Sequence, residues 1–365
     1  MKRRGIAAAL AAVMMVSTCL AGCGGSEKKA ETTAAAAQEA KAEETKAEDT
    51  KAAEPAGDAV EPEFILRYGD VNPEGHVIVN AAHYFADTVK ELSGGRVVIE
   101  IYPSGQLGDD AQCYQAMQMG ALDLYRGNSA SLTDFGNPQV AALALPYIFR
   151  DRDHFWKVCS SELGDRILAN MQESGSQMVG IAFLDEGARN FFTTTKPITK
   201  LDDIKNLKIR VQSSELMLDT VSALGASPTP IAYAQLYTSL QSGVVDGAEN
   251  PPASYFSNKF YEVAPNYVKD GHTYAPSIIL MSQITWNKLG EELQGVIMEA
   301  AKMTQEYNKA EIEKADEEAY KAMTEAGVNV LELEDPEAWS AAMEPVYEKH
   351  GAQFMDLINE IKAVQ

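Results

Sequence analysis

One stretch of this chain occurs twice, and that internal repeat limits the possible fold more than any other feature of the sequence. Six identical residues recur at a constant offset. The two sets are Ala111, Gln112, Tyr114, Gln118, Gly120 and Asp123, and then Ala234, Gln235, Tyr237, Gln241, Gly243 and Asp246. The pattern describes a helix, a glycine that ends it and the start of a strand. Two related lobes with a cleft between them are therefore predicted. A shared local way of ending a helix before a strand is the alternative.

The segments around the first copy alternate between strand and helix patterns. In order, they are a strand at 65–68, a helix at 77–92, a strand at 97–101, a helix that Asp109 or Asp110 caps, and a strand at 122–125. This β-α-β-α order predicts a largely parallel α/β sheet.

The second half of the chain continues the alternation. The predicted elements are a strand at 209–211, a helix at 215–224 that Ser213 or Ser214 caps, a strand at 278–281, a long helix at 287–321 and a last helical region at 339–361. Arg210 lies on the opposite face of its strand from Ile209 and Val211, near the carboxyl end. Ligands of open α/β sheets lie beyond such ends.

The N-terminal residues have the pattern of an export signal. Basic residues at positions 2–4 precede an apolar stretch, 6–20, that is too short for a comfortable transmembrane span. The ending Leu20-Ala21-Gly22-Cys23 resembles the lipobox of bacterial lipoproteins. We therefore predict a signal peptide at 1–22 and a lipid anchor on Cys23, which places the protein outside the cytoplasm and on a membrane. An ordinary cleavage site with a coincidental cysteine is the alternative.

Composition separates the next segment from the rest and excludes some functions. Residues 24–62 consist almost wholly of Ala, Glu, Lys, Thr and Asp and cannot bury enough apolar surface to fold alone, so 23–62 is predicted to be a lipid-anchored tether. The whole chain has 31 Lys and Arg against 53 Asp and Glu, a net charge of -22. That balance argues against nucleic acid as a partner. With 4 Cys, a disulfide scaffold is excluded; Cys113 and Cys159 are either bridged or buried free thiols.

Five short segments of the body together resemble the solute-binding subunit of a TRAP transporter, the DctP-type receptor. They are 103–110, 145–147, 207–211, 225–230 and 244–251. The resemblance covers nearly all of 64–365. It implies an α/β, two-lobed, periplasmic-binding-protein-like (Venus flytrap) fold with mixed sheets and a long helix spanning both lobes. Lobe I is assigned to 63–185 plus 276–312, and lobe II to 186–275 plus 313–365.

The resemblance also assigns ligand-binding roles to particular residues. It gives Arg210 a two-point salt bridge to a ligand carboxylate, which suits the planar guanidinium. It matches Arg189 and Asn250 to an Arg and an Asn that contact the ligand. The alternatives are a salt bridge on the surface or between the lobes for Arg210, and a turn residue before Pro251 for Asn250.

Four further residues, three in the first half and one in the middle of the chain, are ligand candidates. Arg126 and Asn128 stand at a strand exit that reaches the ligand in relatives, and His76 follows a turn that does the same. Arg126 either meets an anion or pairs with an acid such as Asp109, and His76 is otherwise a helix-start residue. Tyr233 is available to lie against a sugar ring, although Tyr is more often a core residue.

The predicted function is to capture an organic acid, a sugar acid such as a uronate, in the inter-lobe cleft and deliver it to the TRAP membrane permease. No cofactor and no catalysis are expected. A C4-dicarboxylate is the first alternative ligand, with Arg126 or Arg189 as a second clamp. A secreted hydrolase is disfavoured because the chain has no H-E-x-x-H, no G-x-S-x-G and no zinc spacing. A structural or adhesive lipoprotein remains the third class.

Overall fold

The structure is a computed structural model that describes residues 61–365. The predicted signal peptide, the Cys23 anchor and nearly all of the tether lie outside these residues. Within the described part, no helix combines the length and the apolar character needed to cross a membrane.

The first of two β-sheets has five strands in the order β2-β1-β3-β10-β4. The strands are β1 Phe64–Gly69, β2 Val97–Tyr102, β3 Leu124–Asn128, β4 Met178–Leu184 and β10 Ser277–Ser282. β1 runs parallel to β2 and β3, whereas β10 runs antiparallel to β3 and β4. The first three strands are parallel, as the β-α-β-α order predicts, and β10, a strand from much later in the chain, is the one strand of this sheet that runs in the opposite direction.

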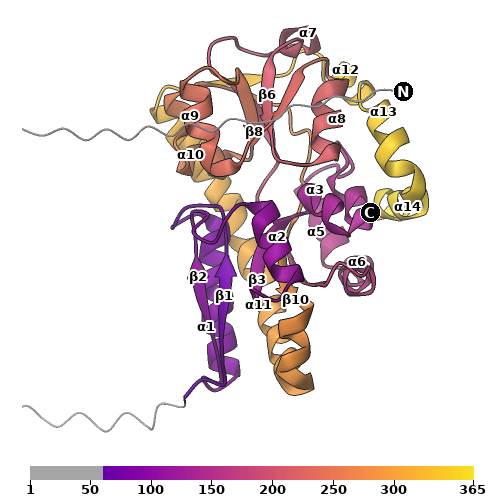
Figure 1. The fold of residues 1–365 in the computed structure, drawn as a ribbon. Coiled ribbons are helices and arrows are strands. Elements are labelled where there is room, and N and C mark those ends of the chain that lie inside the picture. Colours follow the sequence, from indigo (N-terminus) through magenta and orange to yellow (C-terminus); the bar gives the residue numbers. More distant parts are fainter. Residues whose placement is uncertain (1–60) are drawn as a thin grey trace, which may run out of the picture. The chain divides into compact units, whose positions relative to one another are not determined.

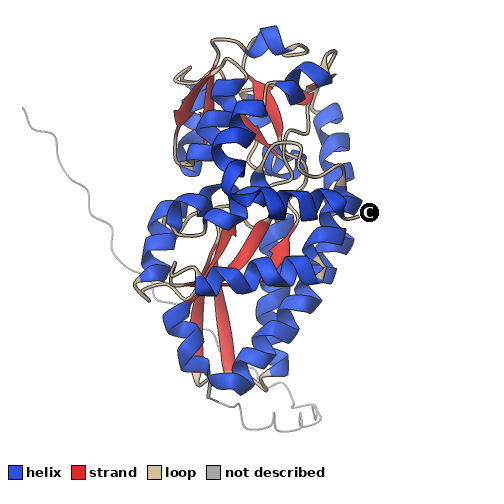
Figure 2. Cartoon of the chain, turned by 90° about the vertical axis from the view of Figure 1, so that its right-hand side faces the viewer, coloured by secondary structure: helices blue, strands red, loops and turns tan. Residues whose placement is uncertain are grey.

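The second sheet has six strands in the order β11-β9-β5-β8-β6-β7. The strands are β5 Asn190–Thr193, β6 Lys208–Val211, β7 Ser227–Pro230, β8 Gly247–Asn250, β9 Asn266–Lys269 and β11 Asn329–Glu332. β6 is parallel to β7 and β8, and β5 is antiparallel to β8 and β9. We call the first sheet and the helices on it the first lobe, and the second sheet with its helices the second lobe (Figures 1 and 2).

Helices surround both sheets (Figure 2). They are α1 Val77–Leu92, α2 Asp110–Gln118, α3 Ser129–Leu132, α4 Ala141–Ala144, α5 Arg152–Cys159, α6 Glu162–Glu173, α7 Leu201–Ile204, α8 Glu215–Ala223, α9 Leu236–Gln241, α10 Pro252–Ser257, α11 Gln283–Glu325, α12 Pro336–Ala341, α13 Glu344–Val346 and α14 Met355–Ala363. Short turns of other helix types are η1 Thr133–Phe135, η2 Pro138–Val140, η3 Tyr233–Gln235, η4 Phe260–Glu262, η5 Tyr347–Gly351 and η6 Ala352–Phe354.

The long helix α11 passes along both lobes (Figure 1). It packs against α1 and β4 of the first lobe and against α10 and β11 of the second. Its regular geometry is interrupted at Gly290, which has φ 74° and ψ 164°. The predicted mixed sheets and the long helix that contacts both of them are confirmed.

The repeated sequence forms the same unit in each lobe. Gly120 and Gly243 both have φ 71°, the left-handed conformation that ends a helix, and β3 and β8 follow them. The Asp123 carboxylate then accepts a hydrogen bond from the backbone N–H of Arg67 at 3.0 Å, and Asp246 accepts one from the backbone N–H of Lys208 at 2.8 Å. In both lobes the repeated aspartate therefore fixes the start of its own strand beside a parallel neighbour, β1 or β6.

The C-terminal region is helical along most of its length, as expected. After α12, the elements α13, η5, η6 and α14 follow one another without a gap from Glu344 to Ala363. Pro336 and Pro345 stand in the first turns of α12 and α13, where a missing N–H breaks no helical hydrogen bond. The Arg150 guanidinium donates to the Val364 carbonyl at 2.7 Å, and His154 Nε2 bonds to the Ile361 carbonyl at 2.9 Å. The end of the chain thus lies against α5, which our division placed in the other lobe. The division by residue number stays a prediction.

We expect Asp123→Ala to lower the free energy of unfolding by roughly 1–3 kcal/mol, because it removes the acceptor of a strand N–H and of a hydroxyl. The Thr285 hydroxyl donates to the same carboxylate at 2.8 Å. Urea unfolding followed by circular dichroism measures the change. Asp202→Ala, which removes only an exposed ion pair with Lys205, is the matched control and should cost less than 1 kcal/mol. Equal effects of the two substitutions would contradict the role given to Asp123.

Candidate functional site

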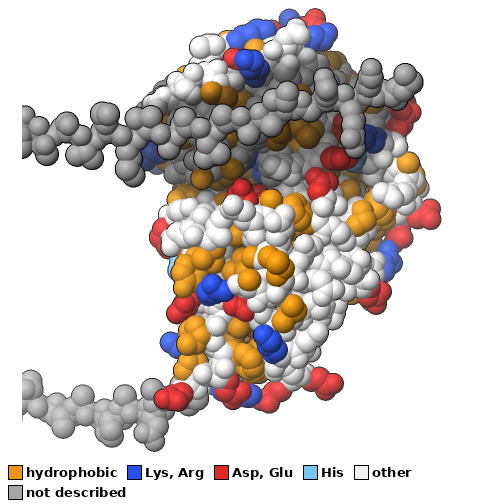
Figure 3. Space-filling view, in the orientation of Figure 1, with side chains coloured by type: hydrophobic (Ala, Val, Ile, Leu, Met, Phe, Trp, Pro, Cys, Tyr) orange, Lys and Arg blue, Asp and Glu red, His pale blue; other side chains and the backbone are white. Residues whose placement is uncertain are grey.

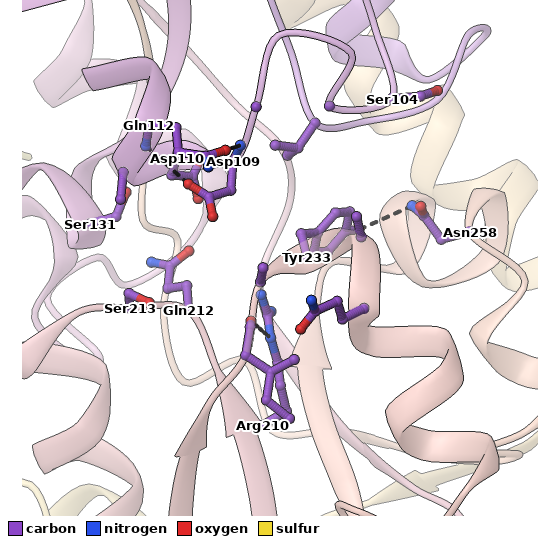
Figure 4. A pocket seen from close by; sticks show the side chains of 18 of the residues that line it. Ser104, Asp109, Asp110, Gln112, Ser131, Arg210, Gln212, Ser213, Tyr233 and Asn258 are labelled. Atoms are coloured by element: carbon purple, nitrogen blue, oxygen red, sulfur yellow. Dashed lines mark hydrogen bonds between the residues drawn. The ribbon is translucent and has the colours of Figure 1, made fainter. Parts of the chain in front are cut away.

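Two adjoining cavities lie between the lobes. The outer one has a volume of about 570 Å³ and the inner one about 20 Å³, room for one oxygen-sized group. Both are lined by Val71, Asp110, Arg210, Gln212 and Tyr233, so they form one continuous site. Figure 4 shows first-lobe side chains facing second-lobe side chains across the outer cavity.

Arg210 stands at the junction of the two cavities. It is on β6, is 3% exposed, and its Nε donates to the Ile231 carbonyl at 2.8 Å. Its guanidinium carbon lies 5.5 Å from the centre of the Tyr233 ring. Within residues 61–365 it forms no salt bridge with a carboxylate, and burial lowers the pKa of Arg210. A buried cation without an anion is costly, so this position favours an anionic ligand.

The other two arginines that line the inner cavity are already paired. Arg126 bonds Glu186 at 3.1 Å and lies 3.5 Å from Asp70. Burial opposes its charge, but Glu186 and Asp70 raise the pKa of Arg126. Arg189 pairs with Glu249 through both Nε and Nη2, the latter at 2.9 Å. Their charges are largely neutralised by protein carboxylates, which distinguishes them from Arg210.

Unpaired hydrogen-bond donors gather around the inner cavity. Asn72 Nδ2, Arg126 Nε and Asn250 Nδ2 are buried and have no hydrogen-bond partner among the described residues. Arg189 donates to the Asn250 side-chain oxygen at 3.4 Å, which leaves the Asn250 amide nitrogen free to donate. All of these atoms are donors, so the group that satisfies them is an acceptor such as a carboxylate.

The remaining predicted residues have different surroundings. Asn128 lines the inner cavity, and its side-chain oxygen accepts a bond from Gln212 Nε2 at 3.0 Å. Tyr233 lines both cavities, and its hydroxyl accepts from Asn258 Nδ2 at 3.0 Å. His76 lines neither. Its Nδ1 caps α1, and its Nε2 bonds Ser254 at 3.0 Å.

Sequence reasoning did not assign several lining residues to the site, among them Asn72, Glu186 and Gln212. Asn72 lies in the turn that suggested His76, and the helix-start pattern drew attention to the histidine instead. Gln212 lies two positions after Arg210. Because successive side chains of a strand point to opposite faces, the two side chains lie on the same side of β6. The two-residue spacing from Arg210 is therefore a sequence signal for Gln212, whereas no local pattern identifies Asn72 as a lining residue.

Few polar contacts join the lobes around the site. Besides Gln212 with Asn128, the Ser214 hydroxyl donates to the Ala130 carbonyl at 2.7 Å, and the Glu215 backbone N–H donates to Asp134 at 3.0 Å. The His76 to Ser254 bond is a fourth. Burial lowers the pKa of His76 to about 4, so at neutral pH this bond is made by a neutral imidazole.

A buried ionic cluster of Glu249, His272 and Asp270 lies beside Arg189. His272 Nδ1 lies 2.6 Å from Asp270, and its Nε2 lies 3.6 Å from Glu249. Burial opposes the charge, but Asp270 and Glu249 raise the pKa of His272 to about 9. Burial also opposes the charge of Glu249, yet Arg189 and His272 lower its pKa to about 2. At neutral pH His272 and Glu249 are therefore charged, and Glu249 holds Arg189 in place through its two hydrogen bonds.

The negative net charge of the chain opposes the approach of an anion at long range. Figure 3 shows Asp and Glu side chains spread around the edge of the visible face. With a net charge of -22 on the chain, capture of an anion depends on the local field of the arginines in the cleft.

Among the described residues no cluster of His, Cys, Asp or Glu could hold a metal ion, and Cys113 and Cys159 are free and buried.

Comparison with known proteins identifies what this chain is similar to. Residues 68–353 match the family described as bacterial extracellular solute-binding protein, family 7, DctP. The C4-dicarboxylate-binding periplasmic protein DctP of Rhodobacter capsulatus is 31% identical over 73% of this chain and 80% of its own length. The sialic acid-binding periplasmic protein SiaP of Vibrio cholerae is 30% identical over 80% of this chain and 90% of its own.

Solved structures of TRAP periplasmic solute-binding proteins have the same fold. A Bradyrhizobium protein in complex with galacturonate is 35% identical, with a TM-score of 0.79, over 81% of this chain and 99% of that one. A Pseudomonas putida protein with bound D-glucuronate has a TM-score of 0.80 at 30% identity, over 82% and 97% of the two chains. A Sulfurospirillum deleyianum protein with bound succinate has 0.77 at 30%, over 84% and 100%. The predicted periplasmic-binding-protein-like fold is confirmed.

We expect the stability that His272 provides to be complete below about pH 6.5 and to disappear as the pH rises through about 9, because its pKa is raised on folding. Unfolding free energies of the wild type and His272→Gln, measured by urea titration between pH 6 and 10, test this. The difference between the two proteins should shrink by about 3 kcal/mol across that window. A constant difference would mean that the buried imidazole is neutral.

Proposed function

The chain belongs to family 7 of the bacterial extracellular solute-binding proteins, the DctP family of TRAP transporter receptors, and from this premise we propose that it captures a uronate-type sugar acid. It is a non-catalytic binding protein that acts outside the cytoplasm. In the proposal, it carries the acid to the membrane permease of its transporter.

The observation that carries the proposal is the unpaired, buried guanidinium of Arg210. Its fork matches a carboxylate at two points, which a Lys ammonium cannot do. Asn72 and Asn250 add donors to the same carboxylate, and Arg189 orients Asn250. Arg126 and Asn128 complete the inner wall.

A single carboxylate suits this site better than two. Arg126 and Arg189, the candidates for a second clamp, are neutralised by Glu186 and Glu249. Arg210 is the one Lys or Arg among the described residues that line the outer cavity. That cavity instead offers hydroxyl, amide and carboxylate groups, which bind sugar hydroxyls. The uronates in similar solved structures support this choice, while the succinate complex and the dicarboxylate-binding relative keep a dicarboxylate as the alternative.

The residues around the carboxylate have separate roles in this proposal. Tyr233 lies against the Arg210 guanidinium and offers its ring to the sugar. His76 acts indirectly, because its bond to Ser254 holds the lobes together. A direct contact of His76 with the ligand gains no support from its position.

We further propose that the protein is held to the membrane by a lipid on Cys23. The basic residues, the apolar stretch and the Leu-Ala-Gly-Cys ending support this. A receptor anchored in this way stays close to its permease without a transmembrane helix.

We expect Arg210→Ala to weaken uronate binding by roughly 2–5 kcal/mol, because the carboxylate loses a buried charged partner. Isothermal titration calorimetry with glucuronate, galacturonate and succinate measures it. The wild type should bind a uronate more tightly than succinate. Arg210→Lys should recover only part of the loss.

Arg166→Ala is the matched control, because Arg166 forms an exposed ion pair with Glu360 away from the cleft. It should bind as the wild type does. Unchanged uronate affinity in Arg210→Ala would remove Arg210 from the site, and tighter binding of succinate would replace the sugar acid by a dicarboxylate.

We expect Cys23→Ser to release the protein from membranes, because a serine has no thiol to acylate. Fractionation of expressing bacteria and mass spectrometry of the mature N-terminus measure the change. Cys159→Ser, at a buried free thiol of the described domain, is the control and should stay membrane-bound. An unmodified Cys23 in the wild type would disprove the anchor.

A further inference from the structure

The outer cavity is larger than one sugar acid requires. Its volume of about 570 Å³ lies within the range of roughly 300–1,000 Å³ that encloses a drug-sized ligand, and a hexuronate is about half of such a ligand. A ligand carboxylate bound to Arg210 would place one of its oxygens in the inner cavity. The uronate ring therefore fills only part of the space beyond Arg210.

Part of the outer cavity forms a wall suited to a second sugar ring. Tyr233, Tyr237, Asn258 and Phe260 of the second lobe line the outer cavity, and the Tyr233 and Phe260 rings meet edge to face at 5.9 Å. The Tyr237 hydroxyl bonds Glu262 at 2.8 Å, which holds this half-exposed ring in place. Sugars pack their apolar faces on aromatic rings of this kind.

The opposite side of the outer cavity offers polar groups and open space. Ser104 and Asp109 come from the loop before α2 and face the second lobe across the outer cavity (Figure 4). Gly105 of the same loop also lines the cavity, and a Cβ added there would have only the Gly108 backbone oxygen within 4 Å, at 3.6 Å. Asp109 repels a further anion and accepts hydroxyl hydrogens.

Charge and shape together define the second group. Since Arg210 is the one cationic lining residue among those described, the outer end selects a neutral, hydroxyl-rich ring. We propose that the site takes an acidic disaccharide, a hexuronate joined to a neutral sugar, with the carboxylate at Arg210 and the neutral ring against Tyr237. This inference rests on the proposed function.

Calorimetry with three ligands tests the inference. The ligands are glucuronate, its methyl glycoside, and glucuronate joined through its anomeric carbon to galactose. The methyl glycoside blocks the same carbon without adding a ring. We expect the wild type to bind the disaccharide at least tenfold more tightly than the methyl glycoside.

Variants separate the second-ring contact from the carboxylate clamp. Tyr237→Ala should reduce the ratio of the two affinities to near one. Tyr261→Ala, which removes a neighbouring ring stacked on Phe256 outside both cavities, should leave the ratio unchanged. Arg210→Ala should weaken all three ligands.

Each outcome decides one of the two proposals. A wild-type ratio near one, or a disaccharide that fails to bind while glucuronate binds, overturns the acidic disaccharide and leaves the uronate receptor standing. A ratio that Tyr237→Ala does not change overturns the assigned wall. If no uronate binds at all, the proposed function fails, and this inference fails with it.

Discussion

A buried guanidinium without a protein carboxylate is the constraint on which the rest of the site depends. Arg126 and Arg189 stand nearby, and each is neutralised by at least one glutamate, so one positive charge remains at Arg210. The free-energy cost of burying that charge is offset when an anion binds beside it. In the proposed function, selection of a single carboxylate depends on the pairing of the neighbouring arginines as much as on Arg210 itself.

The repeated unit explains how the two lobes present this charge. In each lobe a helix ends at a left-handed glycine, and an aspartate then fixes the next strand beside a parallel neighbour. The strand ends that follow carry Arg126 and Asn128 on one side and Asn250 on the other. The starts of the repeats, at Gln112 and Gln235, line the outer cavity from both lobes. The same local unit therefore places lining residues on both sides of one cleft.

The chain crosses between the lobes through a segment that is itself held by charge. Asp185 follows β4 and bonds Arg152 at 2.8 Å, and Arg152 also bonds Asp316 of α11. Gly187 in this crossing has φ 95° and packs on Asp316, so no side chain fits there. The hydrogen bonds that join the lobes around the site include His76 with Ser254, Gln212 with Asn128 and Ser214 with Ala130.

Local sequence determined part of the secondary structure, the glycine stops, the aspartate repeat and the position of Arg210 at a strand end, since each follows from backbone geometry over a few residues. The strands β4, β5, β7, β9 and β11 were not predicted. Tertiary structure decided the rest. It inserted β10 antiparallel into the first sheet, and it turned His76 toward Ser254 while leaving Asn72 at the cavity. It also decided which arginine stays unpaired, because a partner such as Glu249 lies far from Arg189 in sequence. Charge pairing is a property of neighbours in space, and a linear pattern does not contain it.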